Sequence, residues 1–98
     1  MNKREKSLNE TRLSRDSAVA HLASLRERVP DPAVKERLRR MEDSLAVCPP
    51  TTDTGAIDVD NELKTLAAAF LSVSESPALV ERYLARMEKL VARRGGFM

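Results

Sequence analysis

Two side chains in this sequence could act as a nucleophile and its base, Cys48 and His21, and each is the only residue of its type. Nucleophilic catalysis needs such a pair within hydrogen-bond reach. His21 lies in a helix-forming segment and Cys48 in the turn-forming stretch VCPP, and nothing in their spacing brings them together. We interpret His21 as a surface or boundary residue and Cys48 as a small apolar residue at a helix end. A two-residue Cys-Pro match is too short to predict a haem site, so we expect no cofactor.

Acidic residues at alternate positions, Asp58, Asp60 and Glu62, faintly resemble a calcium-binding loop. Counted from Asp58, the sixth and twelfth positions should hold glycine and glutamate, but they hold Leu63 and Ala69. An acidic first helical turn, stabilised by the helix dipole, accounts for these residues. The chain also contains no glycine-rich phosphate loop and no nucleophile-elbow motif. We therefore expect no catalytic, cofactor-binding or metal-binding residues, and no enzyme activity.

Proline and glycine divide the chain into four helix-forming segments, and none shows the alternation of a strand. This pattern predicts an all-α fold, with four helices arranged as two αα-hairpins in a small bundle. We expect one domain over 1–98, with a frayed basic N-terminus over 1–6, a first hairpin over 7–47, a loop over 48–57 and a second hairpin over 58–95. The expected signals for helix ends are a capping box at Ser7 and Glu10, the pairs Asp31-Pro32 and Ser76-Pro77, and a C-terminal cap at Gly95.

Alternating steps of three and four residues define a seam on the first helix. Its members are Leu8, Thr11, Arg15, Ala18, Leu22, Leu25 and Val29. Because Arg15 interrupts the apolar pattern, we expect burial only from Ala18 onward. The N-terminal turns should extend past the hairpin partner and offer a surface for another helix.

Basic residues are concentrated in the N-terminal half of a chain with 17 Lys/Arg, 15 Asp/Glu and a formal net charge of +2. Arg37 and Arg40 lie on the basic side of the second helix. Acidic residues are interspersed, and Glu36 stands at helical spacing from both Arg39 and Arg40. We interpret this surface as a solvated face of mixed charge. The alternative is a DNA-binding regulator that uses a helix-turn-helix-like pair.

A thin, alanine-rich core and the absence of a catalytic set favour a helical protein–protein interaction module, such as an adaptor, small chaperone or regulator. We expect its partner to be another protein bound through an amphipathic helix, and we expect a homodimer. The candidate partner-binding residues are Leu8, Arg15, Leu22, Leu25, Val29, Arg37 and Arg40. No apolar stretch approaches the ~20 residues of a membrane span. No secretory signal is recognisable, so we predict a cytoplasmic protein without membrane contact.

Overall fold

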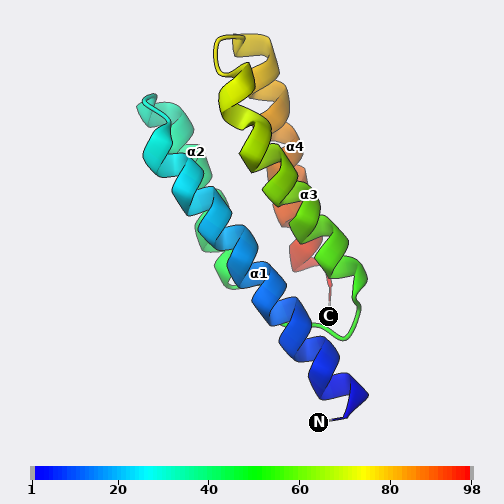
Figure 1. Ribbon diagram of the computed structural model, residues 1–98. Coiled ribbons are helices and arrows are strands. Elements are labelled where there is room, and N and C mark those ends of the chain that lie inside the picture. The colour runs from blue at the N-terminus through cyan, green and yellow to red at the C-terminus, as the bar shows by residue number, and fades with distance from the viewer. Residues whose placement is uncertain (1, 98) are drawn as a thin grey trace.

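The chain forms four α-helices, α1 (Lys3–Arg28), α2 (Pro32–Ala46), α3 (Gly55–Ala69) and α4 (Pro77–Gly95), with a 3-10 turn, η1 (Phe70–Val73), continuing α3 (Figure 1). The computed structural model describes residues 2–97. It contains no strand within that range, which confirms the predicted all-α fold of two helical hairpins.

The side chains of Asp31 and Ser76 cap α2 and α4, as predicted. A carboxylate oxygen of Asp31 accepts a hydrogen bond from the backbone N–H of Ala33 at 2.8 Å. The Ser76 hydroxyl accepts a longer one from Leu79 at 3.4 Å. A proline follows each cap at the start of the helix, where its missing N–H costs nothing. These caps allow the two hairpins to turn within residues 29–31 and 74–76.

The predicted ends of the other helices need correction. The helix α1 begins at Lys3, because the Asn2 side chain caps it through the N–H of Glu5 at 2.8 Å. The predicted frayed segment is therefore helical from Lys3 onward, and Met1 lies outside the described residues.

The helix α3 begins at Gly55 rather than at residue 58. The Asp53 side chain accepts a hydrogen bond from the Gly55 N–H at 2.9 Å. The connection between the hairpins, called the linker below, is residues 47–54. At the other end, Gly96 rather than Gly95 caps α4.

Each helix packs against two others: α1 and α4 both lie beside α2 and α3. The two hairpins stand side by side, with α1 parallel to α3 and α2 parallel to α4 (Figure 1). The result is an elongated bundle of 47 × 19 × 19 Å. The N-terminal turns of α1 reach beyond the rest of the bundle, as predicted, at the end where the C-terminus also lies (Figure 1). This end is called the base below, and the end with the two hairpin turns is called the tip.

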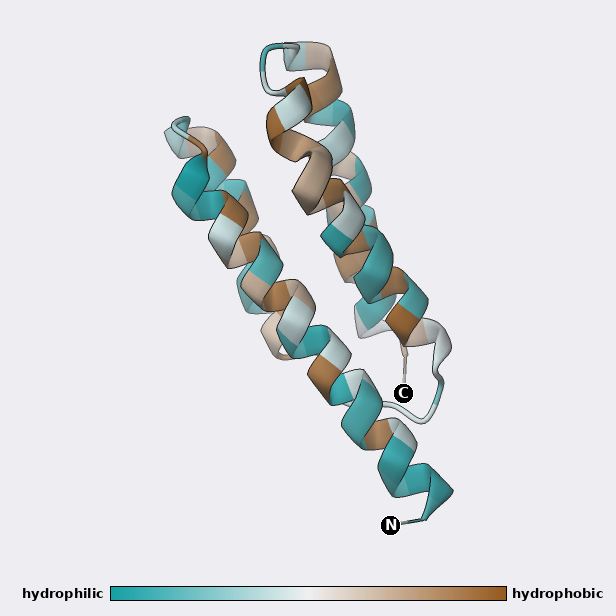
Figure 2. Ribbon diagram, viewed as in Figure 1, coloured by the Kyte–Doolittle hydropathy of each residue, from teal (hydrophilic) through white to brown (hydrophobic). Residues whose placement is uncertain are grey.

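Apolar side chains from all four helices and η1 form a continuous core. The predicted seam supplies Ala18, Leu22 and Leu25 from α1 and Val29 from its C-cap, and these four residues are buried as predicted. In Figure 2, apolar residues recur along each helix, whereas the first turns of α1 are mainly hydrophilic. Phe70 and Tyr83 meet edge to face, with ring centroids 6.4 Å apart, between η1 and α4. Across the described part of the chain, no helix combines the length and the apolar character needed to cross a membrane.

Candidate functional site

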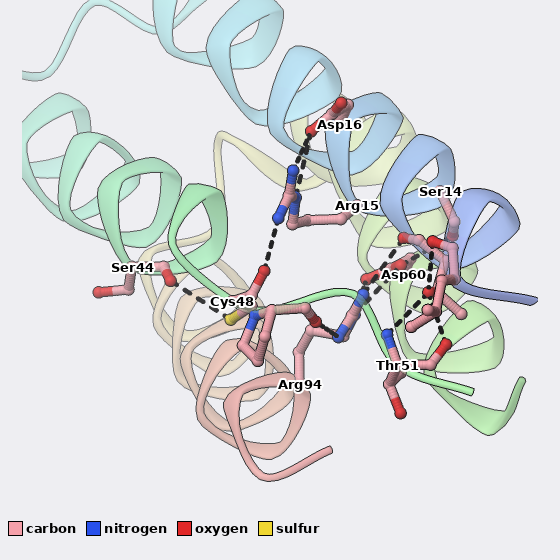
Figure 3. A network of polar contacts seen from close by, with 11 residues as sticks. Ser14, Arg15, Asp16, Ser44, Cys48, Thr51, Asp60 and Arg94 are labelled. Carbon is pink, nitrogen blue, oxygen red and sulfur yellow. Dashed lines mark hydrogen bonds and ion pairs between the residues drawn. The ribbon is translucent and has the colours of Figure 1, made fainter. Parts of the chain in front are cut away.

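The base of the bundle contains a buried ion pair that joins the last turn of α4 to α3 (Figure 3). Nε of Arg94 lies 3.1 Å from Oδ1 and 3.3 Å from Oδ2 of Asp60. Neither side chain has any exposed surface. The Ser14 hydroxyl of α1 donates to Oδ2 of Asp60 at 2.7 Å, so the carboxylate is held from two helices.

The other guanidinium nitrogens of Arg94 donate to backbone carbonyls. Nη1 donates to the oxygen of Pro49 at 3.4 Å, and Nη2 to the oxygen of Thr11 at 3.2 Å. One side chain of α4 therefore contacts α1, α3 and the linker. Across residues 2–97, every buried side-chain nitrogen or oxygen has a hydrogen-bond partner. A buried charge whose three guanidinium nitrogens each donate to a fixed acceptor is typical of a structural network.

Two further side chains of α1 hold the linker against the bundle (Figure 3). Nη1 of Arg15 donates to the Cys48 carbonyl at 2.6 Å. The buried Thr11 hydroxyl donates to the Thr51 carbonyl at 2.8 Å and accepts from the Thr51 N–H at 3.0 Å. We call Thr11, Arg15 and Arg94 the linker clamp, because together they bind the backbone of the linker at three residues.

The predictions for Asp60 and Thr11 were incomplete or wrong. Asp60 was predicted to lie in an acidic first helical turn, yet it is buried and paired with Arg94 in the last turn of α4. Thr11 was expected to lie outside the buried part of the seam, yet it is fully buried. A signal was present in the sequence, since Arg94 follows Met87 and Leu90 at helical spacing on the apolar stripe of α4. A long cation on an apolar stripe indicates a buried partner.

Cys48 and His21 make separate hydrogen bonds with local backbone. The buried Cys48 thiol donates to the Ser44 carbonyl at 3.3 Å, and burial raises the pKa of this thiol. His21 is exposed, with Nδ1 2.8 Å from the Ser17 carbonyl oxygen. Within the described range 2–97, no group of three or more histidine, cysteine or acidic side chains is placed to hold a metal ion.

Three candidate partner-binding residues belong instead to the intramolecular core. Leu22, Leu25 and Val29 are only 0%, 4% and 4% exposed, so their side chains cannot contact a partner in this conformation. The assignment of these three to a partner surface is therefore corrected: the α1 seam is covered by the protein's own helices. Leu8 is half-buried in a hollow shared with the linker, and Arg15 is directed to the Cys48 carbonyl.

The remaining two candidates, Arg37 and Arg40, lie on α2 beside α4. Arg37 bridges the helices, with Nη1 2.6 Å from Glu81 and Nη2 2.6 Å from Glu88. Arg40 is more exposed and lies 3.3 Å from Glu36 of its own helix. The predicted pairing of Glu36 with Arg39 and Arg40 is confirmed.

Two hollows follow the seam between α2 and α4, and together we call them the α2–α4 groove. The hollow near the tip has a volume of about 460 Å³, and its floor includes Val34, Phe70 and Leu84. The second, of about 350 Å³, lies nearer the base beside Met41 and Val91. Arg37 lines both hollows, so its ion bridge to α4 crosses the groove between them. Small side chains border each hollow, Ala33 near the tip and Ser44, Ala92 and Gly95 near the base, whereas charged side chains border the stretch between them.

Comparison with known proteins gives no match. Neither the protein-family models, nor the curated proteins, nor the solved structures contain one that matches this chain.

The ion bridge across the groove gives a prediction for pH. The hydrogen bond from Arg37 holds the pKa of Glu81 below its ordinary value. The folded state thus favours the ionised carboxylate, and the resulting stabilisation is complete above the pKa of the unfolded chain and is lost as the pH falls through the lowered pKa. We expect a carboxylate NMR titration of Glu81 to show a lowered midpoint, which returns to the ordinary value in Arg37→Met. An unchanged midpoint in that variant would show that Arg37 is not the cause.

Proposed function

We propose that this protein is a non-enzymatic interaction module that receives an amphipathic helix of a partner protein in the α2–α4 groove. The observation that carries the proposal is the pair of hollows between two parallel helices, with apolar floors and small residues at their borders. Helix-in-groove recognition uses this arrangement, because apolar side chains of the incoming helix enter hollows while small borders let its backbone approach.

The dimensions of the groove suit such a helix. From Asp31 to Cys48, α2 and the residues around it extend ~26 Å at 1.5 Å per residue, which is about five helical turns. Two hollows separated by an ion bridge favour two apolar anchors on the partner, with a polar residue between them facing Arg37. The exposed arms of the bridge, Glu81 and Glu88, remain able to pair with that residue.

DNA binding by the basic side of α2 has weaker support. All three arginines of α2 are paired with carboxylates in the fold, which offsets the positive charge of this helix: Arg37 with Glu81 and Glu88, Arg39 with Glu36 and Asp43, and Arg40 with Glu36. A gel shift at two salt concentrations tests this alternative, since phosphate binding weakens steeply with salt.

The test of the proposed groove is site-specific crosslinking followed by binding measurements. A photo-crosslinking amino acid is placed at Ala33 or Ala92, which border the groove, and at Ala20, an exposed alanine of α1, as the matched control. We expect a partner peptide to be captured from Ala33 and Ala92 and not from Ala20. Light scattering then shows whether the captured partner is a second copy of this chain, which is the form that a homodimer would take.

The captured peptide is next synthesised and its affinity measured by calorimetry. Filling the groove with Ala92→Trp should weaken binding by about tenfold or more, because a bulky side chain occupies the anchor site. The control Ala20→Trp should leave the affinity unchanged. Equal capture at all three positions, or equal affinity of both tryptophan variants, would refute a helix-binding role for the groove.

A further inference from the structure

We propose that the linker clamp makes the two hairpins of one chain pair with each other and prevents their exchange with the hairpins of a second copy. This inference does not depend on the proposed function of the groove. It rests on the contacts that hold residues 48, 49 and 51 of the linker to α1 and α4.

Exchange between two copies would preserve nearly every contact of the bundle. The pair Arg94–Asp60 lies within the second hairpin, and the bond from Ser14 to Asp60 would form again between chains. Helix packing would likewise recur, with α1 and α2 from one copy and α3 and α4 from the other. Only the conformation of the linker must differ between the two arrangements. When the hairpins of one chain pair with each other the linker turns back, and when they are exchanged it crosses to the second bundle.

The clamp binds the linker in its turned-back conformation. The Thr11 hydroxyl both donates to and accepts from the backbone of Thr51, so it recognises that residue in one orientation only. Arg15 and Arg94 fix the carbonyls of Cys48 and Pro49 from opposite helices. A linker that crosses to another bundle would remove the carbonyl acceptors of Arg15 Nη1 and Arg94 Nη1. It would also remove both Thr51 bonds of Thr11, whose hydroxyl would keep only the longer bond to the Leu8 carbonyl at 3.2 Å. The loss of these bonds is costly. The clamp therefore favours the arrangement within one chain.

The experiment compares clamp variants of the full chain with a variant that weakens the same network without touching the linker. Thr11→Val and Arg15→Met, alone and combined, remove clamp bonds. The control Ser14→Ala removes a bond to Asp60 and leaves the linker contacts in place. Each protein is unfolded in urea and refolded at high concentration under reducing conditions. A mixture of labelled and unlabelled chains is then analysed by isotope-filtered NMR for contacts between core methyl groups of α1 and α3.

We expect such contacts to remain within one chain in the wild type and in Ser14→Ala. In Thr11→Val/Arg15→Met, contacts between chains should appear, with the exchanged fraction rising about tenfold or more for the loss of these bonds. If the double variant does not refold, the single variants should show a smaller rise. Exchanged contacts in the wild type, or their absence from every folded clamp variant, would overturn the proposal. The clamp variants could also form a dimer that shows no contacts between α1 of one chain and α3 of the other. Such a dimer has not exchanged its hairpins, so if it forms only in the clamp variants it would also count against the proposal.

Discussion

The free energy of unfolding should fall by about 3–5 kcal/mol when Asp60 is replaced by alanine, because Arg94 is left charged and unpaired in the interior. Neither side chain has exposed surface, so the guanidinium that loses its carboxylate is not in contact with bulk solvent. The Ser14 hydroxyl would lose its acceptor in the same variant. For a domain of this size the loss is a large share of the total stability. Urea unfolding followed by circular dichroism at neutral pH measures it.

Two further variants show whether the loss comes from the unpaired charge. Asp58→Ala, an exposed acidic residue of the same helical turn, should change the stability by less than about 0.5 kcal/mol. Asp60→Leu combined with Arg94→Met should recover much of the loss, because apolar residues of similar volume leave no uncompensated charge. An Asp60→Ala variant as stable as Asp58→Ala would contradict the burial of this pair.

Truncation of Leu22 to alanine should cost about 2–5 kcal/mol of unfolding free energy, through lost apolar burial and the cavity left behind. The side chain is 0% exposed in the centre of the α1 seam. Leu13→Ala is the matched control on the same helix, since Leu13 is 57% exposed and should change stability by less than about 0.5 kcal/mol. The same denaturation experiment compares the two.

This comparison also decides between the two roles considered for the seam. A leucine that contacts only a partner would leave the stability of the isolated protein unchanged when truncated. A core leucine lowers that stability whether or not a partner is present. Equal stabilities of Leu22→Ala and Leu13→Ala would therefore restore the partner-surface interpretation that the structure has replaced.

The features that sequence reasoning predicted are those governed by local rules. Asp31 and Ser76 cap their helices because a cap requires only a side chain and an N–H two or three residues away. The burial of Leu22 and Leu25 follows from their spacing on one helix. Neither inference needs knowledge of which helices are neighbours.

The features that were missed depend on how the helices pack. Asp60 pairs with Arg94 across 34 positions of sequence, and this contact requires the register of α3 against α4. The helix dipole already accounts for an acidic residue such as Asp60 near the start of a helix, so its charge gives no reason to expect a buried partner. The α2–α4 groove likewise arises from small residues on two helices that are distant in the chain.

The linker clamp also implies an uneven tolerance to mutation. It binds backbone atoms of residues 48, 49 and 51, and a carbonyl oxygen is present in every residue type. As far as these bonds are concerned, the amino acids of the linker can vary, apart from proline at position 51, where the N–H is used. An inserted or deleted residue is different, since it moves the carbonyls away from Arg15 and Arg94. For these bonds, the number of residues between the hairpins is therefore under stricter constraint than their identity.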